Sequence, residues 1–121
     1  MIYTSYFAKI NKLPADAICI SISRHAPKGY NGLVYKELAP SWEILRQYKV
    51  NNNRKEYTDE FLKILKQMDP HSVVHDLYAL AGDQDRDIVL VCYEKSTDFC
   101  HRHLVAEWLT KNGYPVSEYQ F

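Results

Sequence analysis

The sequence predicts a small Rossmann-like α/β fold, a three-layer sandwich with a mainly parallel sheet. The stretch from Ile88 to Tyr93 (IVLVCY) is continuously apolar, which is typical of a strand covered on both faces in a parallel sheet. A helical pattern and a further strand follow, so residues 88–121 indicate a compact βαβ unit. The chain has 121 residues, close to the commonest domain size, and we expect one α/β domain over residues 1–121.

The first third of the chain predicts two strands and a long connection. Residues 2–6 and 17–23 are rich in β-branched residues, as strands are, with a short helical turn expected over residues 7–13. Residues 24–41 contain two prolines, two glycines and an Asn-Gly turn, so neither helix nor strand is expected there. Connections of this length tend to be functional or mobile.

Three helices are expected next. Ser41 is predicted to cap the first and Thr58 the second, which has acidic residues in its first turn. Asp69-Pro70 marks the start of the third helix, and Gly82 its end.

The last helix is expected to follow Asp98 as its N-cap and to end at Gly113. Residues 115–121 predict a final strand with a proline at its start, where no hydrogen-bond donor is needed.

Side chains that could act as nucleophiles, acids or bases lie close in sequence to the end of the buried strand. Cys92 and Glu94 lie at that end, and Cys100, His101 and Arg102 open the next helix. Ligands of open α/β sheets bind beyond the strand ends, and a helix N-terminus suits an anion. We therefore predict a site at this edge, with Cys92, Glu94, Cys100 and His101 as candidate catalytic residues.

Parallel strands would deliver further polar residues to the same edge. The candidate substrate-binding residues are Ser5, Tyr6, Ser23, Arg24, His25, Lys28 and Arg102. A guanidinium at a helix N-terminus is opposed by the dipole unless an anion lies between them. Arg24 and Arg102 are thus expected to hold a phosphate or carboxylate. The alternative for Arg102 is a salt bridge to Asp98 or Glu94.

The cysteines permit two chemistries. Cys100 lies near a helix N-terminus and basic groups, which favours the thiolate, with His101 as its acid or base partner. The alternative is a metal site formed by Cys92, Cys100 and either His101 or His103. The two cysteines are spaced more widely than the usual close pair of zinc sites and no second pair exists, so no metal ligand is assigned and no cofactor is predicted. In a purely structural interpretation, both cysteines are packing residues.

Charge balance argues against a protein that coats phosphate backbones, because 15 Lys and Arg match 15 Asp and Glu. Nucleic-acid binding would depend on a local patch, and the loop over residues 24–40, basic and interleaved with Tyr30 and Tyr35, is one. Alternatively, those tyrosines pin a solvated loop to the body. The sequence shows no signal-peptide pattern and no apolar run of membrane-spanning length, and its three cysteines form no scaffold pattern. We expect a cytoplasmic protein with reduced thiols and no membrane partner.

The segment over residues 91–109 (VCYEKSTDFCHRHLVAEWL) resembles the hallmark of domain-of-unknown-function family 488. There, a strand ends in Cys, Glu-Lys follows, and Cys-His-Arg opens a helix. The stretches TSYF, SISRHAPKGYNG and YKELAPSW also resemble this family, especially its short members in bacteria and phages. The resemblance spans nearly the whole chain and implies a Rossmann-like fold with a polar edge, but no settled activity. That edge would comprise Ser5, Arg24, Lys28, Cys92, Glu94, Cys100, His101 and Arg102.

The sequence leaves three candidate functions. The first is an enzyme that binds a phosphate-bearing substrate, a nucleotide or nucleic acid, at the C-terminal edge of the sheet. The second is a non-catalytic module that uses the loop over residues 24–40 to bind nucleic acid or a protein. The third is a thiol or metal function through Cys92 and Cys100.

Overall fold

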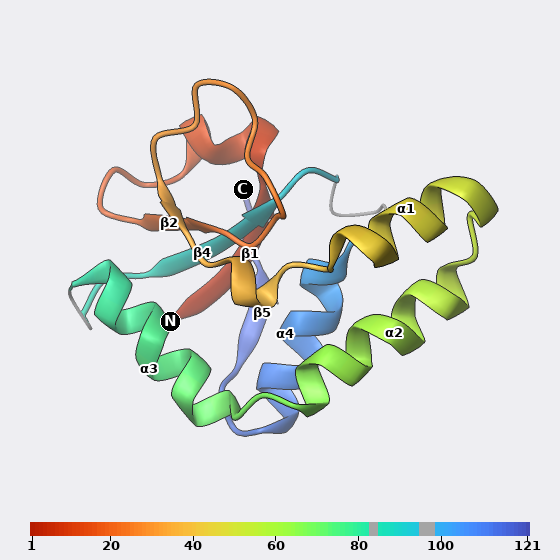
Figure 1. Ribbon diagram of the computed structural model, residues 1–121. Helices are drawn as coiled ribbons and strands as arrows, with labels where there is room; N and C mark the ends of the chain where they lie inside the picture. Colours follow the sequence, from red (N-terminus) through yellow and green to blue (C-terminus); the bar gives the residue numbers. More distant parts are fainter. Residues whose placement is uncertain (83–84, 95–98) are drawn as a thin grey trace.

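The computed structural model describes residues 1–82, 85–94 and 99–121, and its centre is a sheet of five parallel strands (Figure 1). The strands are β1 (Ile2–Tyr6), β2 (Ile18–Ser21), β3 (Leu33–Val34), β4 (Ile88–Cys92) and β5 (Val116–Glu118). Their order across the sheet is β3-β2-β4-β1-β5, and every pairing is parallel. The predicted Rossmann-like α/β fold with a parallel sheet is confirmed.

The central strand is β4, and its position explains its sequence. All of its residues are buried. A strand with neighbours on both sides and layers on both faces has no solvent-facing positions, so it is apolar throughout. The register places Tyr6 of β1 opposite Cys92, and Ser21 of β2 opposite Val91. Three adjacent strands therefore end at one edge of the sheet.

The α-helices pack into one hydrophobic core against the sheet. They are α1 (Trp42–Asn51), α2 (Arg54–Lys66), α3 (Pro70–Ala81) and α4 (His101–Lys111). Apolar residues of all four share one hydrophobic core with Ile88 and Leu90, which are alternate residues of β4. The crossover from β1 to β2 contains only the 3-10 helix η1 (Phe7–Lys12), and it crosses the sheet in the opposite direction to the β4–β5 crossover. Because such crossovers are right-handed, η1 and α4 lie on opposite faces (Figure 1).

Several predicted helix boundaries are confirmed. The Ser41 hydroxyl caps α1 by accepting a hydrogen bond from the N–H of Ile44 at 3.2 Å. Asp69 caps α3 in the same way, and Gly82 follows it with a φ of 75°, in the left-handed region that glycine adopts without strain.

The prediction that Thr58 caps the second helix is wrong. Helix α2 begins about one turn earlier, and the side-chain oxygen of Asn53 caps it by accepting from the N–H of Glu56 at 3.1 Å. Asn52 ends α1 with a φ of 51°. Asparagine tolerates the left-handed region and is a strong N-cap, so neighbouring asparagines end one helix and start the next.

Replacing Asn53 with alanine is expected to lower the free energy of unfolding by about 1 kcal/mol, because α2 loses its cap. Thr58→Ala is the matched control: Thr58 lies inside α2, and its loss is expected to change stability by less than about 0.5 kcal/mol. Urea denaturation measures both. Equal losses in the two variants would contradict this assignment of the cap.

Two other expectations differ from the structure. The connection over residues 24–41 contains strand β3 and the 3-10 helix η2 (Lys36–Leu38), elements too short to leave a periodic pattern in the sequence. Asp98, the expected N-cap of the last helix, lies outside the described residues, and Cys100 occupies the N-cap position of α4. Within the described part of the chain, no helix combines the length and the apolar character needed to cross a membrane.

Candidate functional site

A cavity of about 190 Å³ opens at the C-terminal edge of the sheet, beside the first turn of α4. We call it the edge cavity. Residues singled out in the sequence form part of its wall: Ser23, Arg24, His25, Glu94, Cys100 and His101. The remaining wall consists of Pro40, Leu45, Tyr48, Tyr57, Tyr93 and Phe99. Segments that follow β2 and β4 thus meet the start of α4 around one space.

The other predicted site residues lie outside the edge cavity. Cys92 adjoins it through Cys100, and Arg102 contacts Cys92. The Tyr6 ring packs against the Arg102 guanidinium, 5.6 Å from ring centroid to Cζ. Ser5 is buried, and its hydroxyl has no hydrogen-bond partner among the described residues. Lys28 is exposed in the loop that follows β2.

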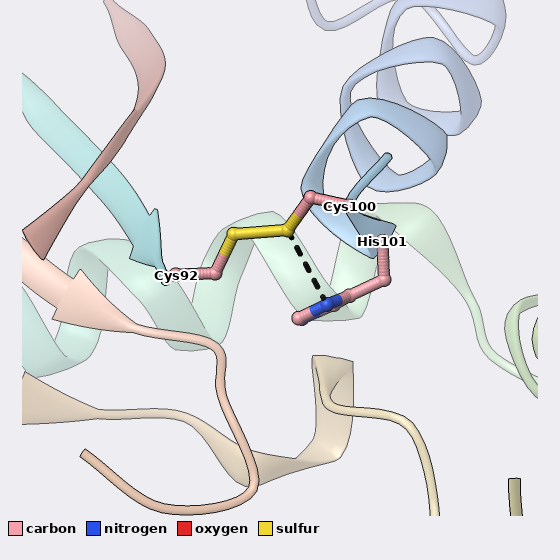
Figure 2. Close-up of side chains that lie close together, drawn as sticks. All are labelled: Cys92, Cys100 and His101. Carbon is pink, nitrogen blue, oxygen red and sulfur yellow. Dashed lines mark hydrogen bonds between the residues drawn. A yellow bond between two sulfur atoms is a disulfide. The ribbon is translucent and has the colours of Figure 1, made fainter. Parts of the chain in front are cut away.

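A disulfide joins Cys92 at the end of β4 to Cys100 at the start of α4 (Figure 2). Both residues are buried, and their Cα atoms are 7.6 Å apart. The expectation of three reduced thiols is therefore incorrect for this pair, whereas Cys19 is a free cysteine. Spacing gave no signal for the pairing, because it is the return of α4 to the end of β4 that brings the two sulfurs together.

His101 is fixed in one tautomer by its surroundings. Its Nε2 lies 2.6 Å from the carbonyl oxygen of Ile22, which can only accept, so Nε2 carries the proton. Nδ1 is then unprotonated, and it lies 3.7 Å from the Sγ of Cys100 (Figure 2). Burial lowers the pKa of His101 to about 4, with the nearby charge of Arg102 acting in the same direction and the bond to Ile22 opposing them. The imidazole is neutral near pH 7 and presents a lone pair to Cys100.

Arg102 is completely buried and holds the region together. Its guanidinium forms a two-point ion pair with Glu118, at 3.1 Å from Nε to Oε1 and 2.8 Å from Nη2 to Oε2. Nη1 donates to the Sγ of Cys92 at 2.9 Å and to the backbone oxygen of Glu94 at 2.6 Å. Among the described residues the salt-bridge partner is thus Glu118, and Glu94 contacts Arg102 through its backbone oxygen, whereas Asp98, the other expected partner, lies outside those residues. With these donors occupied, Arg102 positions Cys92 and the end of β4.

Glu118 is the partner that sequence reasoning missed. It lies on β5, beside Thr4 of β1, whose hydroxyl donates to its Oε1 at 2.6 Å. Burial acts to raise the pKa of Glu118, but the hydrogen bonds from Arg102 and Thr4 outweigh it, and the pKa is lowered. Glu118 is therefore a carboxylate at neutral pH. One glutamate in the predicted final strand carries no sequence signal for such a role.

Arg24 is the arginine that reaches the edge cavity. Its Nε donates to the backbone oxygen of Pro40 at 3.0 Å, and its Nη2 contacts that of Ala39 at 3.4 Å. These bonds fix the guanidinium plane at the wall, and Nη1 makes no hydrogen bond to the described residues. Arg24 and Arg102 therefore do not share one anion site. Of the two arginines expected to hold a phosphate or carboxylate, Arg24 lines the edge cavity and Arg102 does not.

Aromatic rings form one side of the edge cavity. The ring centroids of Tyr57 lie 5.2 Å from Tyr48 and 5.0 Å from Phe99, in edge-to-face arrangements. The rings of His25 and Tyr93, with centroids 6.1 Å apart, also line the cavity. Sequence reasoning did not place Tyr48 or Tyr57 here, because they come from α1 and α2 and reach the cavity only through the packing of those helices.

The tyrosines of the basic loop do not face this space. The Tyr30 hydroxyl donates to the backbone oxygen of Leu33 at 2.7 Å and also contacts that of Cys19 in β2 at 3.3 Å, and burial raises its pKa to about 12. The Tyr35 hydroxyl donates to Asp76 of α3 at 2.8 Å. The loop is thus pinned to the body through its tyrosines, as the structural alternative expected.

The cluster permits two kinds of chemistry. With the disulfide reduced, Nδ1 of His101 is placed to take the proton of the Cys100 thiol. The ligand atoms of Cys92, Cys100 and His101 also lie within 4.8 Å of one another, a separation that allows a shared metal ion.

The parallel sheet, the edge cavity and the Cys-His-Arg helix start define a class, Rossmann-like α/β proteins whose candidate site lies beyond the carboxyl ends of the strands. Within it, the chain belongs to domain-of-unknown-function family 488: the family model DUF488-N3a, described as the active DUF488-N3 subclade, matches residues 2–113. No curated protein and no solved structure matches the chain. The match includes every predicted site residue but ends before Glu118.

Proposed function

We propose that this protein is an enzyme that binds a phosphate-bearing substrate, a nucleotide or a nucleic acid, in the edge cavity. The observation that carries the proposal is the composition of this space, in which an aromatic wall, one oriented arginine and a cysteine-histidine pair share about 190 Å³. The description of the matched family model as an active subclade favours an enzyme over a non-catalytic relative.

Phosphate recognition is assigned to Arg24 and the start of α4. The guanidinium of Arg24 is held by two backbone carbonyls and keeps one nitrogen for a ligand. Helix α4 begins at the same cavity, and the side chain of its N-cap, Cys100, makes no capping hydrogen bond. Free N–H groups and the positive end of a helix dipole attract anions, so both elements favour the same charge.

Base recognition is assigned to the aromatic wall. Rings such as Tyr57 and Phe99 offer faces and edges on which a planar base can pack, and such stacking contributes about 1–3 kcal/mol per base. Cavities that enclose whole ligands usually measure roughly 300–1,000 Å³, so the edge cavity holds one ring or one phosphate group and leaves the rest of the substrate outside. This geometry suits a base turned out of a strand as well as a free nucleotide.

Nucleotide binding is expected to raise the melting temperature, because a ligand at about 100 times its dissociation constant adds about 2.7 kcal/mol to stability. We would screen ribonucleoside and deoxyribonucleoside monophosphates by thermal shift, with inorganic phosphate and ribose 5-phosphate as partial ligands. Arg24→Gln is expected to weaken binding at least about tenfold, since a charge-assisted contact contributes 1.5–3 kcal/mol or so.

Lys28→Gln is the matched control, because it removes a cation from the same loop outside the edge cavity. It is expected to leave nucleotide affinity unchanged. A loss equal to that of Arg24→Gln would move the binding surface to the exposed loop and favour the non-catalytic module. The absence of any shift with all ligands would refute the proposal.

A further inference from the structure

Cys92, Cys100 and His101 meet next to the edge cavity as a compact set of soft and borderline ligands. Their sulfur and nitrogen atoms lie within 4.8 Å of one another, and all three side chains are buried (Figure 2). Two thiolates and one imidazole are a donor set of zinc, which also serves catalytic sites with an open fourth position.

The imidazole is oriented as a metal ligand requires. Its Nε2–H is fixed by the carbonyl of Ile22 at 2.6 Å, which leaves the Nδ1 lone pair directed at Cys100. Histidines that bind metal ions almost always donate their other N–H to a carbonyl or carboxylate in this way. The bond to Ile22 therefore supplies the outer support of a metal site.

The sulfur of Cys92 is also held by a hydrogen bond. The Nη1 of Arg102 donates to it at 2.9 Å, which holds this sulfur in place at the end of β4. Cys100 occupies the N-cap of α4, at the positive end of the helix dipole. Because Glu118 neutralises Arg102, a divalent ion between two thiolates leaves the buried cluster without net charge.

The backbone spacing also fits an ion between the sulfurs. Two thiolates on a tetrahedral zinc lie about 3.8 Å apart, since each Zn–S bond measures about 2.3 Å. The Cα atoms of Cys92 and Cys100 are 7.6 Å apart. Disulfides usually span roughly 4.4–6.8 Å between Cα atoms, so this pair sits at the wider separation that a bridging ion needs.

We propose that, in the reduced protein, Cys92, Cys100 and His101 bind one zinc ion whose fourth position faces the edge cavity. Reduction by an added dithiol delivers two electrons and two protons to the disulfide, and the two thiols release those protons to solvent as the ion binds. Cys100 and His101 line the edge cavity whereas Cys92 does not, which sets the side on which the ion is open.

This inference deepens the proposed function, because it places a Lewis acid where the substrate would bind. Zinc-bound water ionises near pH 7 and can supply the nucleophile. Cys100 is then a metal ligand, and it is not the attacking group.

Zinc content is the first test. Protein purified with a dithiol and without chelator is expected to contain about one zinc per chain by elemental analysis, and substitution with Co²⁺ should give thiolate-to-cobalt charge-transfer absorption. Cys92→Ser, Cys100→Ser and His101→Gln are each expected to lower zinc affinity by on the order of 100-fold or more. Cys19→Ser and His75→Gln are matched controls that should keep the ion, since neither residue belongs to the cluster.

A second measurement uses the unaltered chain and so does not depend on the folding of variants. Zinc is expected to slow alkylation of Cys92 and Cys100 at least tenfold or so, with little change at Cys19, as read by mass spectrometry. Reduced, folded protein that binds neither zinc nor Co²⁺, or zinc that protects all three thiols alike, would overturn the inference.

The proposed function and the proposed zinc site can each be refuted independently of the other. Metal content is measured without nucleotide, and nucleotide binding is measured with and without a chelator. Nucleotide binding by a reduced chain that takes up no zinc retains the proposed function and overturns the metal site. If the chain binds zinc but no nucleotide, the metal site is supported and the assigned substrate is overturned.

Discussion

Replacing Arg102 with alanine is expected to lower the free energy of unfolding by about 3–5 kcal/mol. The guanidinium has no exposed surface and forms a two-point ion pair with Glu118. Its removal leaves a half-buried carboxylate without a counter-charge, an unpaired backbone oxygen at Glu94, and an empty volume beside Cys92. Each of these carries a free-energy cost. Chemical denaturation of the oxidised protein measures the loss.

Two controls separate the buried ion pair from charge in general. Lys111→Ala breaks an exposed pair with Glu107 on the same helix, and the expected loss is under about 1 kcal/mol. The double variant Arg102→Met/Glu118→Leu removes both charges and is expected to be more stable than Arg102→Ala, because no buried charge is left alone. A double variant as unstable as Arg102→Ala would show that packing, and not the unpaired carboxylate, dominates.

Lowering the pH from 6.5 to 4 is expected to reduce stability by up to about 3 kcal/mol through His101 alone. In the folded protein the pKa of His101 is about 4, lowered chiefly by burial, whereas an unfolded histidine has its ordinary pKa of 6.5. Between these values the unfolded chain binds more protons than the folded one. Stability is therefore complete above pH 6.5 and is lost as the pH falls through the window toward 4.

Glu118 acts in the same direction at lower pH. Its folded pKa is lowered, so its contribution is present above the ordinary pKa of 4.5 and is lost as the pH falls below it.

Urea denaturation at several pH values, with a chelator present, measures the slope of stability against pH. His101→Gln is expected to flatten the slope between pH 4 and 6.5, while His75→Gln, an exposed change on α3, is expected to keep it. An unchanged slope in His101→Gln would assign the acid sensitivity to other groups.

The sequence identified the edge of the sheet correctly because that edge is encoded locally. Cys92 ends an unmistakably buried strand, and the Cys-His-Arg start of α4 follows within a short stretch of chain. The family resemblance drew on the same segment, and the match over residues 2–113 confirms it. The convergence of the β2 and β4 ends then followed from one general rule, that parallel strands end on the same side.

The missed features depend on contacts between distant segments. Glu118 meets Arg102 only because β5 docks beside β1, and Tyr57 reaches the edge cavity only through helix packing. The disulfide depends on the path that brings α4 back to β4. Periodicity and capping signals describe single elements, so the sequence could suggest Arg102 as a charge in need of a partner without identifying the partner.

The hydrogen bonds that hold His101, Cys92 and Arg102 in place have a consequence for how the chain folds during its synthesis. Ile22 and Glu118, which lie far apart in the sequence, must both be in place before these side chains are fixed. Contacts between such distant positions form late in folding, and a growing polypeptide lacks the ion pair of Arg102 until Glu118 has been translated. We expect both sulfurs to be more accessible to redox agents and metal ions at that stage than in the folded protein, where both cysteines are buried.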